Sequence, residues 1–349
     1  MSSKINGLAS YIDMVEVDVF YINSEFVIDG TGFKSIIGDK FNLKVENEEL
    51  NIALNSRSIF THFKGIVDFG KVLNESEKFV DRSPADRSRA TQHHCFEGGW
   101  VWLIPFENGI TSVGLNLDND HYPMNDQGAK EEFWTIIDQF PIIKGLLSGK
   151  ENVRPYIKTG RIQYFNKKMV GDRWAMLPAS AYGLDGWFST GLASSFIAIH
   201  RLVDILDNRV FPNKKFNRNE LLDYELAMKI EYHHVSKMVH GIYKSFKNYD
   251  VFKNYCSLCF MGAESYLANG GAKKGMELSS LLLNAGDSEF VKKFDVIYKT
   301  IIELSEKDEV SEKDIASLNS YIREDMVDYN FRNFGDPEMR GMHPKVEVC

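Results

Sequence analysis

The chain has 349 residues, of which 44% are hydrophobic and 26% are charged, and its formal net charge is −8. This composition excludes a disordered chain, and the negative charge with scattered basic residues excludes a strong nucleic-acid footprint. No apolar run reaches the roughly 20 residues that cross a bilayer, and acidic Asp13 and Glu16 lie where a signal peptide would be apolar, so we expect a cytoplasmic protein without membrane contact.

The first predicted elements lie between residues 14 and 41. Residues 14–28 alternate apolar and polar side chains around a turn, which predicts a pair of strands. The stretch FVIDGTGFKSIIGDKF (residues 26–41) then runs from an apolar strand through Asp29–Gly32 into a short helix, the order of parts found where a phosphate meets a helix N-terminus. As a dinucleotide fingerprint it is incomplete, because its third small residue is Ser35 and the helix has only about two turns.

The middle of the chain predicts a mostly antiparallel sheet. Short strands are expected near residues 58–69, 89–117 and 152–178, separated by turn signals. One helix interrupts them at residues 129–140 (AKEEFWTIIDQF), and Pro141 ends it. Its apolar face predicts core packing rather than a ligand cage, and it is formed by Phe133, Trp134, Ile136, Ile137 and Phe140.

From residue 191 onward the pattern becomes helical. GLASSFIAIHRLVDIL (residues 191–206) predicts one helix, and a longer amphipathic run starts at Asn219, with Leu222, Leu226 and Ile230 four residues apart. The charged segment ELSEKDEVSEKD (residues 303–314) predicts a solvated helix end and a turn. We therefore expect the last third of the chain to be a helical unit.

The cysteines and histidines do not predict a metal centre. Cys256 and Cys259 have metal or redox spacing, but they stand alone in an aromatic helical stretch, which favours buried apolar thiols over a zinc or redox pair. The other two cysteines, Cys95 and Cys349, are too few and too distant to complete a disulfide framework. His93 and His94 would point to opposite faces of a strand. Three histidines on the long helix lack the spacing of a metal site, and these are His233, His234 and His240.

Two further stretches could carry chemistry. In EGGWVWLIPFENG (residues 97–109), Trp100, Trp102 and Ile104 share one face of a strand. Two tryptophans placed in this way could simply cover a core, although the string Trp-x-Trp-x-Ile-Pro is specific. In residues 172–202 a strand passes into a loop of small residues, and a helix then begins at residues 189–191. The free backbone N–H groups and the positive dipole end of that helix suit an anion.

The three stretches, in this order, resemble flavin-dependent halogenases (tryptophan halogenase-like) and their relatives among the FAD-dependent monooxygenases. The resemblance covers about residues 14–210, and residues 325–344 look like the C-terminal segment of the family. It implies an oxidoreductase in which reduced FAD and oxygen form a C4a-hydroperoxide and a halide ion is oxidised to hypohalous acid. That oxidant would reach an aromatic small molecule or a carrier-bound substrate through a tunnel. A flavin reductase is the implied partner that supplies reduced flavin.

The resemblance also implies roles for individual residues. Trp100 and Trp102 correspond to the signature tryptophans that line the path between flavin and substrate. The implied FAD-binding residues are Asp29, Gly30, Gly32 and Asp185. The implied halide-binding residues are Ser189, Thr190 and Gly191.

The sequence departs from the family pattern in several places. No Gly-x-Gly-x-x-Gly precedes residue 14, so the chain is expected to start in the middle of the fold, and the catalytic lysine of the family is assigned neither to Lys34 nor to any other lysine. The Gly-Asp pair of the family falls at Pro178-Ala179. Phe188 stands where tryptophan-specific members carry a glutamate, which favours a phenol-type or carrier-bound substrate, or a monooxygenase relative.

The predicted fold class is α+β: the C-terminal part of a flavoprotein-monooxygenase-type FAD/NAD(P)-binding fold, with an antiparallel-sheet substrate domain and a C-terminal helical region. The expected units are residues 1–45 (remnant of the FAD-binding domain), 46–170 (substrate domain), 171–210 (return to the FAD-binding domain) and 211–349 (helical region). Three hypotheses remain: a halogenase-like enzyme whose start has been lost, a pseudoenzyme or partner subunit without FAD, and an unrelated α+β binding protein. We expect FAD binding by this chain alone to be weak or absent.

Overall fold

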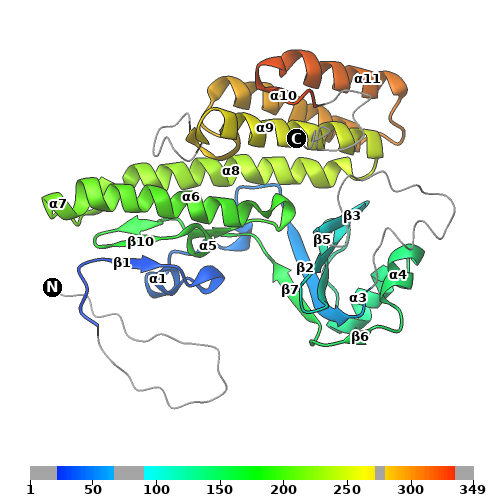
Figure 1. Cartoon of the computed structure of the whole chain (residues 1–349), viewed down its shortest axis with the longest axis horizontal. Coiled ribbons are helices and arrows are strands. Elements are labelled where there is room, and N and C mark those ends of the chain that lie inside the picture. Colours follow the sequence, from blue (N-terminus) through cyan, green and yellow to red (C-terminus); the bar gives the residue numbers. More distant parts are fainter. Residues whose placement is uncertain (1–21, 67–89, 272–279, 335–349) are drawn as a thin grey trace.

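A computed structural model describes residues 22–66, 90–271 and 280–334. In this part of the chain a small sheet and a large antiparallel sheet lie side by side, and a stack of long helices runs above the small sheet to one end of the large one (Figure 1). The architecture confirms the predicted α+β class, with its antiparallel sheet and its helical C-terminal region.

The small sheet has the strand order β1-β10-β9. β1 (Val27–Asp29) runs parallel to β10 (Trp174–Met176), and β9 (Val170–Gly171) is antiparallel to β10. The neighbouring pair β8 (Tyr164–Phe165) and β11 (Tyr182–Gly183) is also antiparallel. Of the strand pair expected at residues 14–28, residues 14–21 lie outside the described residues, and the described strand of that pair, β1, pairs with β10.

The large sheet has the order β3-β4-β5-β2-β6, with β7 also paired to β2, and every pairing in it is antiparallel, as predicted. Its strands are β2 (Ser56–Lys64), β3 (Gln92–Phe96), β4 (Gly99–Pro105), β5 (Ile110–Asp118), β6 (Glu151–Asn152) and β7 (Ile157–Arg161). α3 (Ala129–Ile137) and α4 (Pro141–Leu147) pack on it, and Pro141 opens α4. The aromatic face of α3 belongs to this core, as predicted, with Phe133 fully buried.

The helical layer is built on α6 (Thr190–Ile205), which packs against the small sheet on one side and against α8 (Leu222–Ser245) on the other. α9 (Tyr249–Ala268), α10 (Ser288–Ser305) and α11 (Glu312–Ser320) lie on the far side of α8 (Figure 1). Between α10 and α11 lies the predicted solvated turn, and Ser311 with Asp314 forms a capping box that starts α11. Short segments complete the chain: η1 (Gly32–Lys34), α1 (Ile36–Lys40), η2 (Asn47–Glu49), α5 (Pro178–Ala181), η4 (Trp187–Ser189), η5 (Leu206–Val210), α7 (Phe211–Asn213), η6 (Arg218–Leu221), η9 (Leu282–Asn284), η10 (Tyr321–Asp325) and η11 (Val327–Tyr329).

The amphipathic run after Asn219 is a helix, as predicted, and the structure shows which of its stripes is buried. Leu222 and Leu226 are 37% and 50% exposed. The neighbouring stripe of Tyr224, Met228 and Tyr232 faces the core instead. Both stripes have the same spacing of four residues, and the larger side chains bury more apolar area when they turn inward.

Two buried thiols lie on α9. Cys256 and Cys259 are 5% and 3% exposed among apolar neighbours, and burial raises the pKa of the Cys256 thiol to about 12. The described residues contain no group of three metal-ligating side chains. These observations confirm buried apolar thiols. Within the same ranges, none of the helices is long and apolar enough to cross a membrane.

Candidate functional site: the turn between Asp185 and Gly191

The Asp29–Gly32 turn lies at the end of β1, and its carboxylate is occupied by the turn itself. Asp29 Oδ1 accepts hydrogen bonds from the backbone N–H of Thr31 at 3.0 Å and from its hydroxyl at 2.6 Å. Asp29 Oδ2 accepts the N–H of Ile37 in α1 at 2.9 Å. Gly32 adopts a left-handed φ of 72°, which favours glycine. Gly30 completes the turn, and the predicted cofactor contacts of Asp29, Gly30 and Gly32 stay predictions. In this structure Asp29 fixes the path of the backbone.

The signature tryptophans stand on β4, where one faces the core and the other lies at its edge. Trp100 is 2% exposed, and its indole N–H donates to Tyr243 Oη at 3.0 Å. Trp102 is half-buried and donates to Ser112 Oγ at 3.2 Å. A Cβ at Gly114, directly across from Trp102 on β5, would collide with the Trp102 ring, so this position requires glycine. The core interpretation holds for Trp100, and a path along these rings stays a prediction.

Asp185 forms the centre of a buried polar cluster that the sequence did not reveal. Its Oδ2 accepts the hydroxyls of Ser56 at 2.6 Å and Tyr243 at 2.9 Å. Its Oδ1 accepts the side-chain amide of Asn116 at 3.2 Å and the backbone N–H of Trp187 at 3.0 Å. We call Asp185, Ser56, Asn116 and Tyr243 the Asp185 cluster. Burial raises the pKa of Asp185, and the four donated hydrogen bonds oppose that rise.

The Asp185 cluster joins three distant parts of the chain. Ser56 begins β2, Asn116 is on β5 and Tyr243 is in the last turn of α8. The predicted role of Asp185 in binding the cofactor stays a prediction, because both of its oxygens are already used inside the protein. The sequence carried no signal for the cluster, because the burial of the polar strand residues Ser56 and Asn116 is seen only in the folded chain.

After Asp185 the backbone makes a strained turn into α6. Phe188 and Ser189 both adopt left-handed conformations, with φ of 60° and 52°. In the described part of the chain no side chain caps α6, so its first N–H groups, including those of Thr190 and Gly191, have no partner within the helix. These donors and the positive end of the helix dipole are suited to a small anion.

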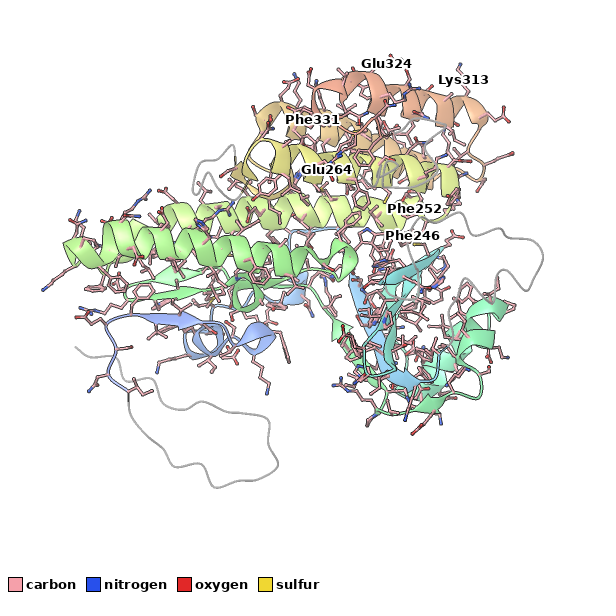
Figure 2. The ribbon with its side chains drawn as sticks, viewed as in Figure 1. Phe246, Phe252, Glu264, Lys313, Glu324 and Phe331 are labelled. Carbon is pink, nitrogen blue, oxygen red and sulfur yellow. The ribbon has the colours of Figure 1, made fainter. Side chains whose placement is uncertain are left out.

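An aromatic cluster surrounds this turn. The rings of Trp100 and Trp187 meet edge to face, with centroids 5.0 Å apart, and His93 lies against both. Phe246 and Phe252 close the cluster where the helical layer meets the large sheet (Figure 2). The structure therefore brings together Trp100, Asp185 and the predicted halide turn. The Asp29–Gly32 turn reaches this region through α5, since Gly32 N–H donates to Ser180 Oγ at 3.0 Å.

The residues present fit one edge of an FAD molecule better than its diphosphate. The start of α6 offers unpaired backbone donors, and the buried Nε1 of Trp187 nearby has no hydrogen-bond partner among the described residues. The carboxylates of Asp29 and Asp185, in contrast, are already hydrogen-bonded. The start of α6 is therefore the part of the described chain that keeps backbone donors free, and its role in binding a flavin ring or a halide stays a prediction.

The chain is similar to curated halogenases. It is 31% identical over 261 residues to the tetracycline 7-halogenase of Kitasatospora aureofaciens. The aligned stretch covers 70% of this chain and 45% of that protein. It is 30% identical over 247 residues to the monodechloroaminopyrrolnitrin halogenase PrnC of Pseudomonas fluorescens, which covers 68% and 41%. The crystal structure of halogenase PltM in complex with phloroglucinol and FAD has a TM-score of 0.77 and 20% identity, and covers 93% of this chain and 69% of that chain.

The described fold is thus that of flavin-dependent halogenases. The tryptophan halogenase family model matches residues 9–258, and the chain belongs to this family. This confirms the resemblance of the three stretches and removes the hypothesis of an unrelated α+β binding protein. The chain spans less than half the length of the two curated relatives.

Proposed function

We propose that this protein takes part in the FAD-dependent halogenation of an aromatic substrate, and that it holds the halide at the start of α6. The observation that carries this proposal is the uncapped helix N-terminus directly after two left-handed residues. Strained backbone of this kind persists where surrounding structure holds it, and it is concentrated at functional sites. Here the Asp185 cluster holds it, because Asp185 accepts the N–H of Trp187.

The residues of this chain have separate tasks in the proposed reaction. The turn at Ser189–Gly191 binds and orients a halide ion through the N–H groups of Thr190 and Gly191, since the Ser189 N–H already donates to the carbonyl of Gly186 at 3.2 Å. Trp100, Trp187 and their aromatic neighbours exclude water from the turn, which protects an oxidised halogen from other reactions. FAD, when bound and reduced, supplies the electrons that activate oxygen for oxidising the halide. A flavin reductase that supplies reduced FAD belongs to the same proposal.

A second candidate is a partner subunit or pseudoenzyme that keeps the substrate domain and does not bind FAD. The occupied carboxylates of Asp29 and Asp185 favour it, as does Ala179 in place of the family's aspartate. Removing a charged acceptor from a cofactor site costs about 1.5–3 kcal/mol of binding. We therefore expect FAD to separate from this chain during gel filtration. A yellow eluted protein with one flavin per chain would contradict the weak-binding expectation.

The deciding experiment supplies excess FAD, a flavin reductase, NADH and chloride or bromide, and looks for halogenated phenols by mass spectrometry. The matched variants are Gly191→Pro, which removes one backbone N–H in the first turn of α6, and Gly191→Ala, which keeps it. Proline is tolerated there, and a Cβ at Gly191 meets open space. We expect Gly191→Pro to raise the halide KM about tenfold and Gly191→Ala to leave it unchanged. No halogenated product from the wild-type chain would decide for the partner subunit, and equal KM values in the two variants would remove the halide site.

A further inference from the structure

We propose that a relay of three redox-active side chains, Trp102, Trp100 and Tyr243, carries an oxidising equivalent away from the proposed halide turn. Tyr243 ends the relay, because on oxidation it can pass its proton to Asp185. The relay protects the chain from strong one-electron oxidants, such as a halogen atom. Its electron transfer is argued from the described contacts alone, and only the source of the oxidant rests on the proposed function above.

Three indole rings are in contact around Trp100. The ring centroid of Trp100 lies 5.8 Å from that of Trp102 and 5.0 Å from that of Trp187. Aromatic rings that pack together have centroids about 4.5–7 Å apart. Electron transfer between side chains slows steeply with distance, so it is fastest between rings that touch. An electron missing from either neighbour is therefore replaced from Trp100.

The last member of the relay is hydrogen-bonded to Trp100. The indole N–H of Trp100 donates to Tyr243 Oη at 3.0 Å, and the Tyr243 hydroxyl donates to Asp185 Oδ2 at 2.9 Å. Trp100 and Tyr243 are both buried, so bulk water does not reach these bonds. The two hydrogen bonds form an unbroken path from an indole to a phenol and then to a carboxylate.

The oxidising equivalent settles on Tyr243 because this phenol has a bonded base. A phenol is oxidised readily when its proton can leave with the electron. Burial raises the pKa of Asp185, which makes its carboxylate a stronger proton acceptor. Burial also raises the pKa of Tyr243 well above its usual range, so the proton does not leave before oxidation. Proton transfer leaves both groups neutral, which the buried environment favours.

The indoles lack such a base. Trp102 donates its N–H to the hydroxyl of Ser112 at 3.2 Å, and Trp100 donates to a phenol. The buried Nε1 of Trp187 has no hydrogen-bond partner among the described residues. An oxidised indole at these positions keeps its proton and therefore its positive charge, which is costly in a buried environment. The indoles conduct the charge, and Tyr243 holds the radical.

The steps balance in electrons and protons. A halogen atom takes one electron from Trp102 or Trp187 and becomes a halide ion, which leaves an indole radical cation. That ring takes an electron from Trp100, and Trp100 takes one from Tyr243. The proton of Tyr243 moves to Asp185 Oδ2. The products are a halide ion, a neutral phenoxyl radical and a neutral carboxylic acid.

A second buried tyrosine in the same core provides a matched control. Tyr255 of α9 is fully buried and belongs to the same hydrophobic cluster as Tyr243. Its hydroxyl has no hydrogen-bond partner among the described residues, so no carboxylate is bonded to take its proton. Burial raises the pKa of both phenols well above the usual range. The two tyrosines therefore differ chiefly in the presence of a bonded base.

The test places a photosensitiser beside the relay in the full 349-residue chain, without flavin or halide. A ruthenium label on Glu107→Cys lies at the exposed end of the β4–β5 hairpin that carries Trp102. Serine replaces Cys95 and Cys349, and the two remaining native cysteines are buried. A light flash with a cobalt(III) quencher oxidises the label. Transient absorption and electron paramagnetic resonance then identify the radical.

We expect a long-lived tyrosyl radical in the labelled protein. Tyr243→Phe should abolish it and leave a short-lived tryptophan radical, whereas Tyr255→Phe should leave it unchanged. Trp100→Phe should slow its formation, because it removes the intermediate ring. Asp185→Asn, which keeps the size of the side chain but removes the base, should lower its yield. Deuterated water should slow its formation, because a proton moves with the electron.

The same label on Lys313→Cys controls for position, because Lys313 lies on α11 at the outer edge of the helical layer (Figure 2). Radicals formed from that label should not depend on Tyr243. The proposal is overturned if the Glu107→Cys label yields no tyrosyl radical, or if Tyr243→Phe leaves that radical in place. It is also overturned if Trp100→Phe leaves the rate unchanged. If Asp185→Asn does not fold, equal rates in ordinary and deuterated water overturn the proton transfer.

Failure of the proposed function is distinguishable from failure of this inference. A Tyr243 radical without halogenated product under any condition supports the relay and removes the proposed source of its oxidant. Halogenation without a Tyr243 radical removes the relay and leaves the halogenase proposal intact. Where wild type halogenates, Tyr243→Phe should lose activity after fewer turnovers than Tyr255→Phe, and equal lifetimes would overturn the protective role.

Discussion

The turn from Asp185 to Gly191 lies between two buried regions. In one region the buried polar groups are hydrogen-bonded, and in the other two buried hydroxyls are not. On one side, the Asp185 cluster satisfies its members, with four donors on one carboxylate. On the other side, the apolar cavity between α6, α9 and η9 is lined by Thr190 and Tyr266, whose hydroxyls have no partner among the described residues. Burial does not explain the difference, because Asp185 is 8% exposed and both cavity residues are 5% exposed.

The difference teaches which region stabilises the fold and which costs stability. A polar cluster with all its hydrogen bonds gains nothing from a ligand, and it rigidifies what surrounds it. The hydroxyls of Thr190 and Tyr266 have no partner among the described residues, so their burial costs stability. The Asp185 cluster fixes the backbone at Trp187, and the lining of the cavity includes Thr190 of the same short turn.

The strongest test of the satisfied region is Asp185→Ala. This change leaves the hydroxyls of Ser56 and Tyr243, the amide of Asn116 and the N–H of Trp187 without their common acceptor. We expect the free energy of unfolding to fall by about 3–5 kcal/mol, measured by urea denaturation. Asp138→Ala removes an exposed carboxylate of a surface ion pair and should change it by less than about 0.5 kcal/mol. A loss below about 1 kcal/mol for Asp185→Ala would mean that the cluster does not hold the turn.

Lowering the pH tests a buried contact between α8 and η9, in which His234 Nε2 lies 3.2 Å from the carbonyl oxygen of Leu283. Burial lowers the pKa of His234 to about 4 from its ordinary value of 6.5. Between these pH values the unfolded chain holds a proton on this histidine and the folded chain does not, so the free energy of unfolding falls as the pH falls from 6.5 to 4. The upper limit of this loss is about 3 kcal/mol for one residue.

The measurement is urea unfolding at several pH values between 7 and 4. His234→Gln should reduce the decline only in part, because burial also lowers the pKa values of His94 and His240 to about 4. His200→Gln, at an exposed position of α6, should leave the decline as in wild type. An equally steep decline in the His234→Gln protein would show that other groups cause it.

Two tyrosine-to-phenylalanine changes compare the two regions most directly. The first is Tyr243→Phe, which removes a hydroxyl that has hydrogen-bond partners. The change removes one donor to Asp185 and the acceptor of the Trp100 N–H. We expect a loss of about 2 kcal/mol in the free energy of unfolding, because the indole N–H of Trp100 stays buried without a partner. Trp100→Phe in the same background should then cost less than it does in wild type, which a double-mutant cycle would measure.

Local sequence patterns predicted the elements better than the site. The helix at residues 129–140, the strand carrying Trp100 and Trp102 and the helix after Gly191 follow from periodicity over a few residues. The Asp185 cluster could not be predicted in this way, since its members come from β2, β5, α8 and the loop before η4 and meet only in the folded chain. The spacing of Leu222, Leu226 and Ile230 predicted the helix but not its buried face, because only packing decides between two stripes of equal spacing.

We expect the smallest effect on the free energy of unfolding from Tyr266→Phe, the second of the two tyrosine changes. Its hydroxyl has no partner among the described residues, so its removal deletes a desolvation cost and breaks no bond. We expect the free energy of unfolding to stay the same or to rise by up to about 1 kcal/mol, in urea denaturation without ligand. A loss like that of Tyr243→Phe would show that Tyr266 is already paired in the free protein. A gain in stability would show that this hydroxyl is buried without a partner in the folded chain and that its burial costs stability.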